Sequence, residues 1–332
     1  MSNSDRKIGN VKDLGEDFRK LSTDVLGSIH EIARLRVFAG EFEKALALLD
    51  APIPAVIEDF AEGRAIARHL ILKAEVVLYQ AVYSSDGHDL AFAPLEEASQ
   101  IAGTLQDEAL LADVLAMRAW ILCYRELAIG RPRDAMIEPA QKCLEIRQKL
   151  NDSVGTSEAL VLLGLANEFK EERDAAKAQE LYLKANELSE KHNEKRWRSY
   201  ATRHIGFYQA NEGNLDGALA WFQRSLRLRQ EIGFIAFLSP AYYAVGQVQL
   251  DRGEIDEAIK YSQEAYDLGT KLGMDRFRFI ALLPLGEAYA RRGDVERGKQ
   301  VLNQAKVMAS SFGERFVAAV DESIAKVEEL TK

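Results

Sequence analysis

The chain has 332 residues, a formal net charge of −9 and 47% hydrophobic residues, a composition that is ordinary for a soluble folded protein. Its length fits two or three globular domains or one elongated array. A nucleic-acid binder needs clustered positive charge, so the acidic balance argues against that class. No run of about 18 apolar residues occurs and the N-terminus is polar, so we expect no membrane span, no secretory signal and a cytoplasmic setting.

The N-terminal region begins with a polar stretch, residues 1–15, which we expect to form a flexible tail. Apolar residues then recur at helical spacing from Glu16 to Phe38. Gly40 follows as a turn residue before a second, shorter helical run. We therefore predict a helical hairpin that ends at Pro52 and Pro54, followed by another short helix.

The next two hairpins each carry a proline. A long helix is predicted from Arg64 to Tyr83. Pro94 and Pro139 would break a helix interior, so we place each in the first turn of a second helix. The preceding loops, residues 84–90 and 129–133, are longer than the later ones. Such loops are either tolerated insertions or functional loops on a rigid scaffold.

The second half of the chain repeats itself about every forty residues. The turns "EGNLDGA", "RGEIDEA" and "RGDVERG" hold Gly213, Gly253 and Gly293 in register. Each unit closes on a residue suited to a left-handed position after the second helix. These closing residues are Gly233, Gly273 and Gly313, with Asn193 and Asn151 in the preceding units. This period predicts a solenoid of hairpins, each of which buries its apolar face against its neighbours.

The repeated unit resembles the tetratricopeptide repeat, in its long form of about forty residues. The resemblance rests on an apolar–glycine pair, a glycine turn, an alanine and a second small residue, as in Val245-Gly246, Gly253, Ala258 and Ala265. It implies an all-α fold, a right-handed α-solenoid in which stacked helix–turn–helix repeats form a superhelix. The expected parts are a tail at 1–15, divergent N-terminal helical hairpins at 16–152, regular repeats at 153–313 and a C-terminal capping helix at 314–332.

Two motif matches fail on their context. Residues 293–299 satisfy G-x-x-x-x-G-K, but no strand precedes them and Gln300 occupies the Ser/Thr position of a phosphate loop. His30 opens "HEIAR", which lacks the second histidine of a zinc pair. Cys123 and Cys143 are too few for a disulfide framework and are expected as packed, reduced thiols. We therefore predict a non-enzymatic protein without catalytic, cofactor-binding or metal-binding residues.

The resemblance also implies a concave groove lined by the first helix of each hairpin, and helical periodicity selects its inward positions. The predicted peptide-binding residues are Arg196, Arg203, Phe207, Tyr243, Gln247, Arg276 and Glu287. The chain carries about +2 charges from Lys191 onward and about −11 before it. We expect the three arginines to donate bidentate hydrogen bonds to an acidic or carboxylate-bearing peptide. Alternatively, they are solvated or paired with neighbouring glutamates.

Two function classes fit these features. The first is a scaffold that holds a protein or peptide segment in its groove. The second is a peptide-responsive regulatory protein that controls a partner through a change of superhelical pitch, with the N-terminal hairpins as an effector module. Trp197, Phe237 and Phe277, which open the regular units, serve either as packing staples or as an exposed ligand platform. Neither class predicts a nucleic-acid or membrane partner, and the oligomeric state is not specified.

Overall fold

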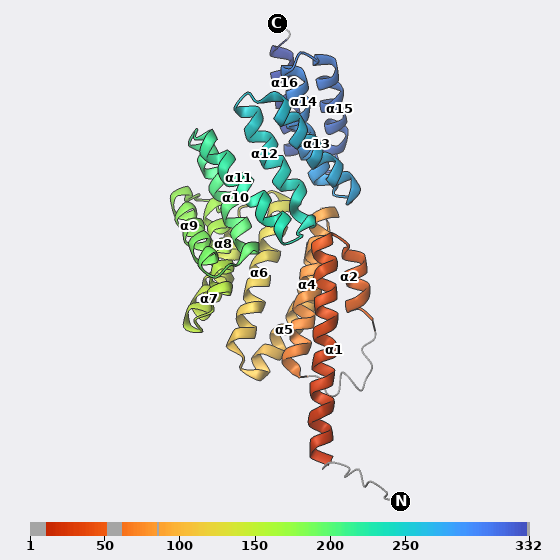
Figure 1. Cartoon of the computed structure of the whole chain (residues 1–332), viewed down its shortest axis with the longest axis vertical. Helices are drawn as coiled ribbons and strands as arrows, with labels where there is room; N and C mark the ends of the chain where they lie inside the picture. The colour runs from red at the N-terminus through yellow and green to blue at the C-terminus, as the bar shows by residue number, and fades with distance from the viewer. Residues whose placement is uncertain (1–10, 52–61, 85, 331–332) are drawn as a thin grey trace, which may run out of the picture.

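A computed structural model of the chain describes residues 11–51, 62–84 and 86–330 (Figure 1). Within these ranges the chain is helical and contains no strand, and consecutive helices pack as antiparallel hairpins that stack into an elongated superhelix. The fold is therefore the predicted all-α solenoid. None of the described helices is long and apolar enough to cross a lipid bilayer.

The helices of the described ranges fall into seven hairpins and a last single helix. They are α1 (Val11–Ala39) and α2 (Phe42–Leu49); α4 (Gly63–Ser84) and α5 (Phe92–Leu105); α6 (Glu108–Ile129) and α7 (Ile137–Lys149); α8 (Ser153–Phe169) and α9 (Ala175–Lys191); α10 (Lys195–Asn211) and α11 (Leu215–Glu231); α12 (Leu238–Asp251) and α13 (Ile255–Lys271); α14 (Asp275–Arg291) and α15 (Val295–Ala309); and α16 (Glu314–Glu329). Short 3₁₀ turns precede three of them: η1 (His88–Ala91), η2 (Asp134–Met136) and η3 (Ile235–Phe237).

The repeated glycines occupy the bends between paired helices. Gly213, Gly253 and Gly293 have φ values of 77°, 81° and 99°, which an L side chain rarely adopts. After the second helices, Gly233 (φ 67°) and Asn193 (φ 52°) take the same left-handed conformation. The register inferred from the sequence is thus confirmed.

Small residues set the spacing within each hairpin. A Cβ atom on Gly206 of α10 would lie 2.6 Å from the Phe222 ring of α11, and one on Gly286 of α14 would lie 2.6 Å from Leu302 of α15. Gly298 also lies at a close helix contact, because a Cβ atom there would lie 2.7 Å from the backbone oxygen of Gly286. The glycines of the apparent phosphate-loop motif therefore serve the turn and the helix contact.

One predicted boundary changes, and others lie outside the described residues. Helix α1 begins at Val11 rather than at Glu16, so the last five positions of the expected tail are helical. Residues 1–10 are not described. The predicted end of the first hairpin at Pro52 and Pro54, and the short helix after it, also lie outside the described ranges.

The two proline-containing hairpins match their prediction. Pro94 and Pro139 both lie in the first turn of their helices, where the missing N–H group disrupts no intrahelical hydrogen bond. The loop before α7 ends in η2, where Met136 is fully buried. Both cysteines are reduced and buried, and burial raises the pKa of each thiol.

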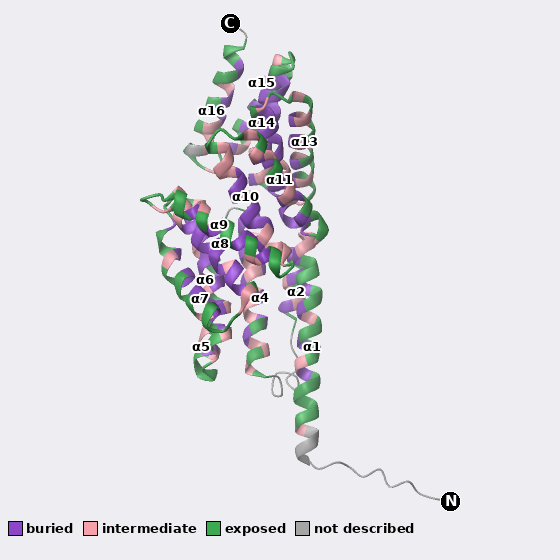
Figure 2. Ribbon diagram, turned by 60° about the vertical axis from the view of Figure 1, so that its left-hand side comes forward, coloured by how far each residue is buried: buried purple, intermediate pink, exposed green. Residues whose placement is uncertain are grey.

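The superhelix closes on itself. The first helices α4, α6, α8, α10, α12 and α14 contact one another in turn, and α4 then also touches α14, while α1 touches η3. One continuous apolar cluster accordingly runs from Ala33 in α1 to Phe237 and Met274 in the later repeats. Figure 2 shows these buried residues along the middle of the stack, with exposed residues along α1 and α5.

Candidate functional site

The first helices enclose a cavity of about 440 Å³ on the inner side of the superhelix. Its walls come from α4, α6, α8, α10, η3, α12 and α14, with Arg229 added from α11 and Arg133 from the loop before α7. This volume falls in the range of small-ligand sites. The cavity therefore suits a ligand of a few residues rather than a folded domain.

The N-terminal helices close one side of this cavity. Val82 of α4 lines the wall. The next residue, Tyr83, donates a hydrogen bond from its hydroxyl to the backbone oxygen of Ala236, and its ring centroid lies 6.4 Å from that of Phe277. Tyr79, one turn earlier, packs against Phe237 with ring centroids 5.0 Å apart. The cavity thus exists because α4 of the second hairpin meets η3 and α14 of the later hairpins.

The cavity is strongly positive. Its lining includes five arginines and one carboxylate, Glu168, an excess of four positive charges in a protein whose net charge is −9. The Glu168 carboxylate already has two partners within the protein. It contacts Nδ1 of His204 at 2.8 Å and accepts a hydrogen bond from the Tyr182 hydroxyl at 2.7 Å. Burial lowers the pKa of His204, so the imidazole is neutral at pH 7. The five arginines are Arg133, Arg173, Arg203, Arg229 and Arg276.

Arg203 has no carboxylate partner among the described residues. Its guanidinium carbon lies 4.6 Å from the centroid of the Phe207 ring, and its Nε atom is buried without a hydrogen-bond partner. Burial lowers the pKa of Arg203, because desolvation penalises the charged form. Removing a cation from water without a counterion costs free energy, and an anionic ligand offsets that cost.

Arg229 and Arg133 are held by neutral groups. Arg229 is 1% exposed and donates from Nη1 to the backbone oxygen of Phe237 at 2.6 Å. Burial lowers the pKa of Arg229 to about 10. The Arg133 guanidinium carbon lies 3.8 Å from the Phe169 ring centroid. Aromatic faces and a carbonyl oxygen therefore position these cations and leave their charge for a ligand.

Residues 239–268, which span most of the α12–α13 hairpin, match the tetratricopeptide repeat family. The same hairpin geometry recurs from α8 to α15. The α12–α13 hairpin is therefore a tetratricopeptide repeat, and the fold of the chain is a stack of hairpins like it. No curated protein matches its sequence.

Several solved structures share the fold of this tetratricopeptide repeat protein. A Rap protein complexed with competence and sporulation factor has a TM-score of 0.55 at 13% identity, with 93% of this chain and 98% of that chain covered. A signal transduction ATPase with a tetratricopeptide repeat sensor, from Pyrococcus horikoshii, has a TM-score of 0.54 at 16% identity, with 98% and 53% covered. BtubC from P. vanneervenii has a TM-score of 0.52 at 16% identity, with 70% and 91% covered. These identities show a shared fold and nothing finer.

The predicted groove residues of this tetratricopeptide repeat protein do not all lie in the cavity. Arg203, Phe207 and Arg276 line the cavity. Arg196 does not: it pairs with Glu75 and donates to the Tyr79 hydroxyl at 2.6 Å. The Glu75 carboxylate raises the pKa of Arg196 even though burial alone would lower it.

The remaining predicted residues lie outside the cavity lining. Tyr243 is half-buried, and burial raises the pKa of its phenol while the nearby Arg203 charge opposes that rise. Gln247 donates to Asp251 at 3.0 Å. Glu287 is buried and accepts a hydrogen bond from Ser323 of α16 at 2.7 Å. Helix α16 therefore covers the end of the stripe that periodicity assigned to the groove.

Periodicity missed three groups that define the cavity. Arg229 lies on a second helix, so a search of first-helix positions does not select it. Arg133 lies in the loop 129–133, and the length of that loop was the one feature of the sequence that pointed to this residue. Glu168 lies on the first helix of the unit before the three clearest repeats.

The aromatic residues Trp197 and Phe237 are buried. Trp197 contacts the ring of Trp120, and Phe237 contacts the ring of Tyr79.

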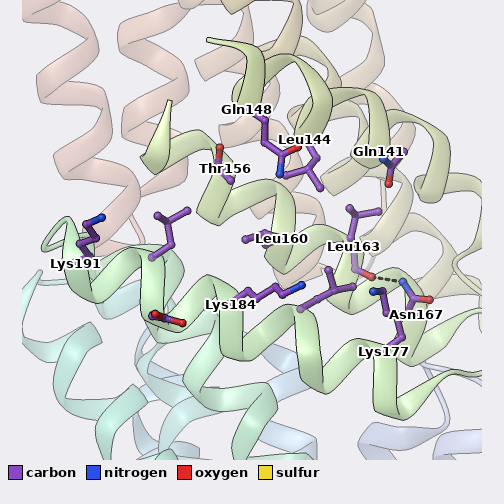
Figure 3. A pocket seen from close by; sticks show the side chains of 13 residues that line it. Gln141, Leu144, Gln148, Thr156, Leu160, Leu163, Asn167, Lys177, Lys184 and Lys191 are labelled. Atoms are coloured by element: carbon purple, nitrogen blue, oxygen red, sulfur yellow. Dashed lines mark hydrogen bonds between the residues drawn. The ribbon is translucent and has the colours of Figure 1, made fainter. Parts of the chain in front are cut away.

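A second cavity, of about 580 Å³, lies on the outer surface between α7, α8 and α9 (Figure 3). Its floor consists of leucines such as Leu160 and Leu163. Of the lysines at its rim, Lys177 and Lys184 both pair with Glu180. Because these lysine charges are already paired and solvated, they would attract a charged ligand less strongly than the arginines of the inner cavity. Within the described ranges no group of acidic, histidine or cysteine side chains could hold a metal ion.

Proposed function

We propose that this tetratricopeptide repeat protein is a protein-interaction scaffold that binds an acidic or carboxylate-bearing peptide segment in its inner cavity. The single observation that carries the proposal is the Arg203 guanidinium, whose Nε atom is buried without a hydrogen-bond partner, which pairs with no carboxylate of the described residues and which lines an arginine-rich cavity. Arginine matches a carboxylate through two parallel hydrogen bonds, and these bonds strengthen where water is excluded. The aromatic side chains around it supply apolar contact for the rest of the segment.

The proposal assigns no chemical reaction to the cavity. Glu168 and His204 bind one another, and the thiol of Cys123, also in the lining, has a pKa that burial raises. An ionised thiolate is the reactive form, so this raised pKa makes Cys123 a poor nucleophile. The charged groups therefore favour recognition of an anion over catalysis.

Binding can be tested with two pentapeptide libraries that differ only in having Asp and Glu or Asn and Gln at the same positions. The acidic library is expected to raise the thermal unfolding temperature of the protein, because a ligand that binds only the folded state stabilises it. Arg203→Glu and Arg276→Glu should remove this rise. Arg224→Glu is the matched control, since Arg224 is 40% exposed in its side chain and lies on the outer helix α11. Equal shifts with both libraries, or an equal loss in the control, would contradict the assignment.

One observation favours the regulatory alternative as a second candidate. The cavity wall includes Val82 of α4 as well as Phe277 and Ile280 of α14, so a bound segment touches the second and the seventh hairpins of the superhelix together. A ligand with contacts on both sides stabilises the closed arrangement relative to an open one. Small-angle scattering with and without the acidic library should then show a smaller radius of gyration when ligand is present. An unchanged radius of gyration would contradict the regulatory function and would be consistent with the scaffold function alone.

A further inference from the structure

Helix α1 carries a second apolar face that its own molecule leaves exposed. Leu21, Val25, Ile32 and Leu35 are 61%, 43%, 48% and 71% exposed, although all four are large apolar side chains. In Figure 1 this helix extends well beyond its neighbours toward the N-terminal end. Contiguous exposed apolar surface of this kind typically marks an interaction site.

The opposite face of the same helix is already used. Leu26, Ala33 and Val37 are at most 1% exposed and pack inside the molecule. An ordinary surface helix has one apolar stripe, which faces its core, and polar residues elsewhere. Burial within its own fold therefore does not explain the exposed stripe of α1.

The spacing of the exposed residues is that of a coiled coil. Leu21, Val25, Ser28, Ile32 and Leu35 follow one another at alternating steps of four and three residues. This repeat averages 3.5 residues, which keeps a stripe straight against a second helix that winds around the first. The helix is 29 residues long, which is enough for about four heptads. The stripe therefore fits an α-helix better than a strand or an irregular loop.

A row of acidic residues runs along one edge of the stripe. Asp17, Asp24 and Glu31 recur every seven residues, all three are exposed, and the described residues provide no ion-pair partner for any of them. With Val25 and Ile32 at the a positions of the heptad, Asp24 and Glu31 take the preceding g positions, and Asp17 takes the g position one heptad earlier. Coiled-coil helices select their partners by charge at g. The matching positions of an incoming helix are thus expected to carry lysine or arginine.

The same row argues against a second copy of α1 as the occupant. An antiparallel pair of α1 helices would bring the two acidic rows together. A parallel pair would place Asp17 and Asp24 opposite Ser22 and Ile29, which are turned toward their own molecule. In that pair only Glu31 would meet a basic residue, Arg36.

We propose that the exposed stripe of α1 docks an amphipathic helix of a different protein, with leucine-like residues at heptad spacing and a basic flank. This surface is separate from the inner cavity, so it does not depend on the peptide site. The protein would then hold two partners, one in its cavity and one along α1.

Two synthetic four-heptad peptides test the proposal. Both have isoleucine at a and leucine at d; one carries lysine at e and g, and the other glutamate. Fluorescence anisotropy with the full-length protein should show binding of the lysine peptide and about tenfold or more weaker binding of the glutamate peptide. Leu21→Lys and Ile32→Lys should each weaken binding of the lysine peptide by about tenfold or more. Val307→Lys, at another exposed apolar residue (76% exposed), is the matched control and should change nothing.

A charge swap separates helix recognition from general adhesion. Asp24→Lys combined with Glu31→Lys should reverse the preference, so that the glutamate peptide binds more tightly. Equal binding of both peptides, or loss of binding in the Val307 variant as well, would overturn the proposal. So would sedimentation showing a wild-type dimer that Leu21→Lys dissociates, because a second copy would then cover the stripe.

Discussion

Arg196 of α10 and Glu75 of α4 form an ion pair across 121 positions of the chain. Both side chains are largely buried, at 23% and 13% exposure. The pair joins the N-terminal hairpins to the regular repeats beside the layer of Tyr79 and Trp197. It therefore helps to fix the closed superhelix that forms the cavity.

Replacing Arg196 by Met should destabilise the protein by about 3 kcal/mol, because Glu75 would stay buried without its partner. The double variant Arg196→Met with Glu75→Met should recover most of this loss. Urea unfolding followed by circular dichroism measures both effects. Lys142→Met is the matched control: Lys142 pairs with Glu138 on the surface, where such a pair contributes about 0.5 kcal/mol. A similar loss in the control would show that general charge, rather than the buried pair, is responsible.

Gly206→Ala should destabilise the protein by about 1 to 3 kcal/mol, because the new methyl group would overlap the Phe222 ring. Gly27→Ala makes the same chemical change in α1, where a Cβ meets nothing within 4 Å. That control should stabilise the protein by about 0.5 to 1 kcal/mol through helix propensity. Chemical denaturation of both variants gives the comparison. A gain in stability in both variants would mean that helix propensity, not packing, governs Gly206.

The sequence carries the repeat because its constraints are local. A left-handed bend at Gly213 and a close approach at Gly206 depend on residues within one hairpin, so their spacing reveals the fold. The cavity depends instead on how far the superhelix has turned when α14 returns to α4. Periodicity does not encode this curvature. Periodicity therefore placed Arg203, Phe207 and Arg276 on the inner surface. It could not distinguish them from Arg196, whose side chain is already paired with Glu75 of the N-terminal hairpins.

Glu158 predicts a pH dependence of stability. Burial raises the pKa of Glu158 to about 7, although the Arg196 charge and a 2.8 Å hydrogen bond from Trp120 Nε1 oppose the rise. An acid whose pKa is raised by folding binds its proton more tightly in the folded state, so it lowers stability as the pH rises from about 4.5 to 7. Glu158→Gln should leave stability near pH 4 unchanged and increase it by about 1 to 2 kcal/mol at pH 8.

The measurement is a series of urea unfolding curves between pH 4 and pH 8 for the wild type and the Glu158→Gln variant. Trp120 fluorescence should change with the same midpoint in the wild type, because its indole N–H donates to the titrating carboxylate. Glu180→Gln is a suitable control, since Glu180 is a surface residue paired with lysines. A constant difference between wild type and Glu158→Gln at all pH values would show that Glu158 does not titrate in this range.

Arg203 and Arg229 should respond in opposite ways to the same substitution. Arg203→Met removes a half-buried cation that has no counterion and leaves no hydrogen-bond acceptor behind, so it should stabilise the ligand-free protein by about 1 kcal/mol. Arg229→Met removes the donor to the backbone oxygen of Phe237 and should destabilise it by about 1 to 3 kcal/mol. Denaturant unfolding without peptide measures both. Both variants should also lose the thermal shift with acidic peptides. A stabilised Arg203→Met protein that still responds to those peptides would show that the cation is structural, and the cavity would then need another anion-binding group.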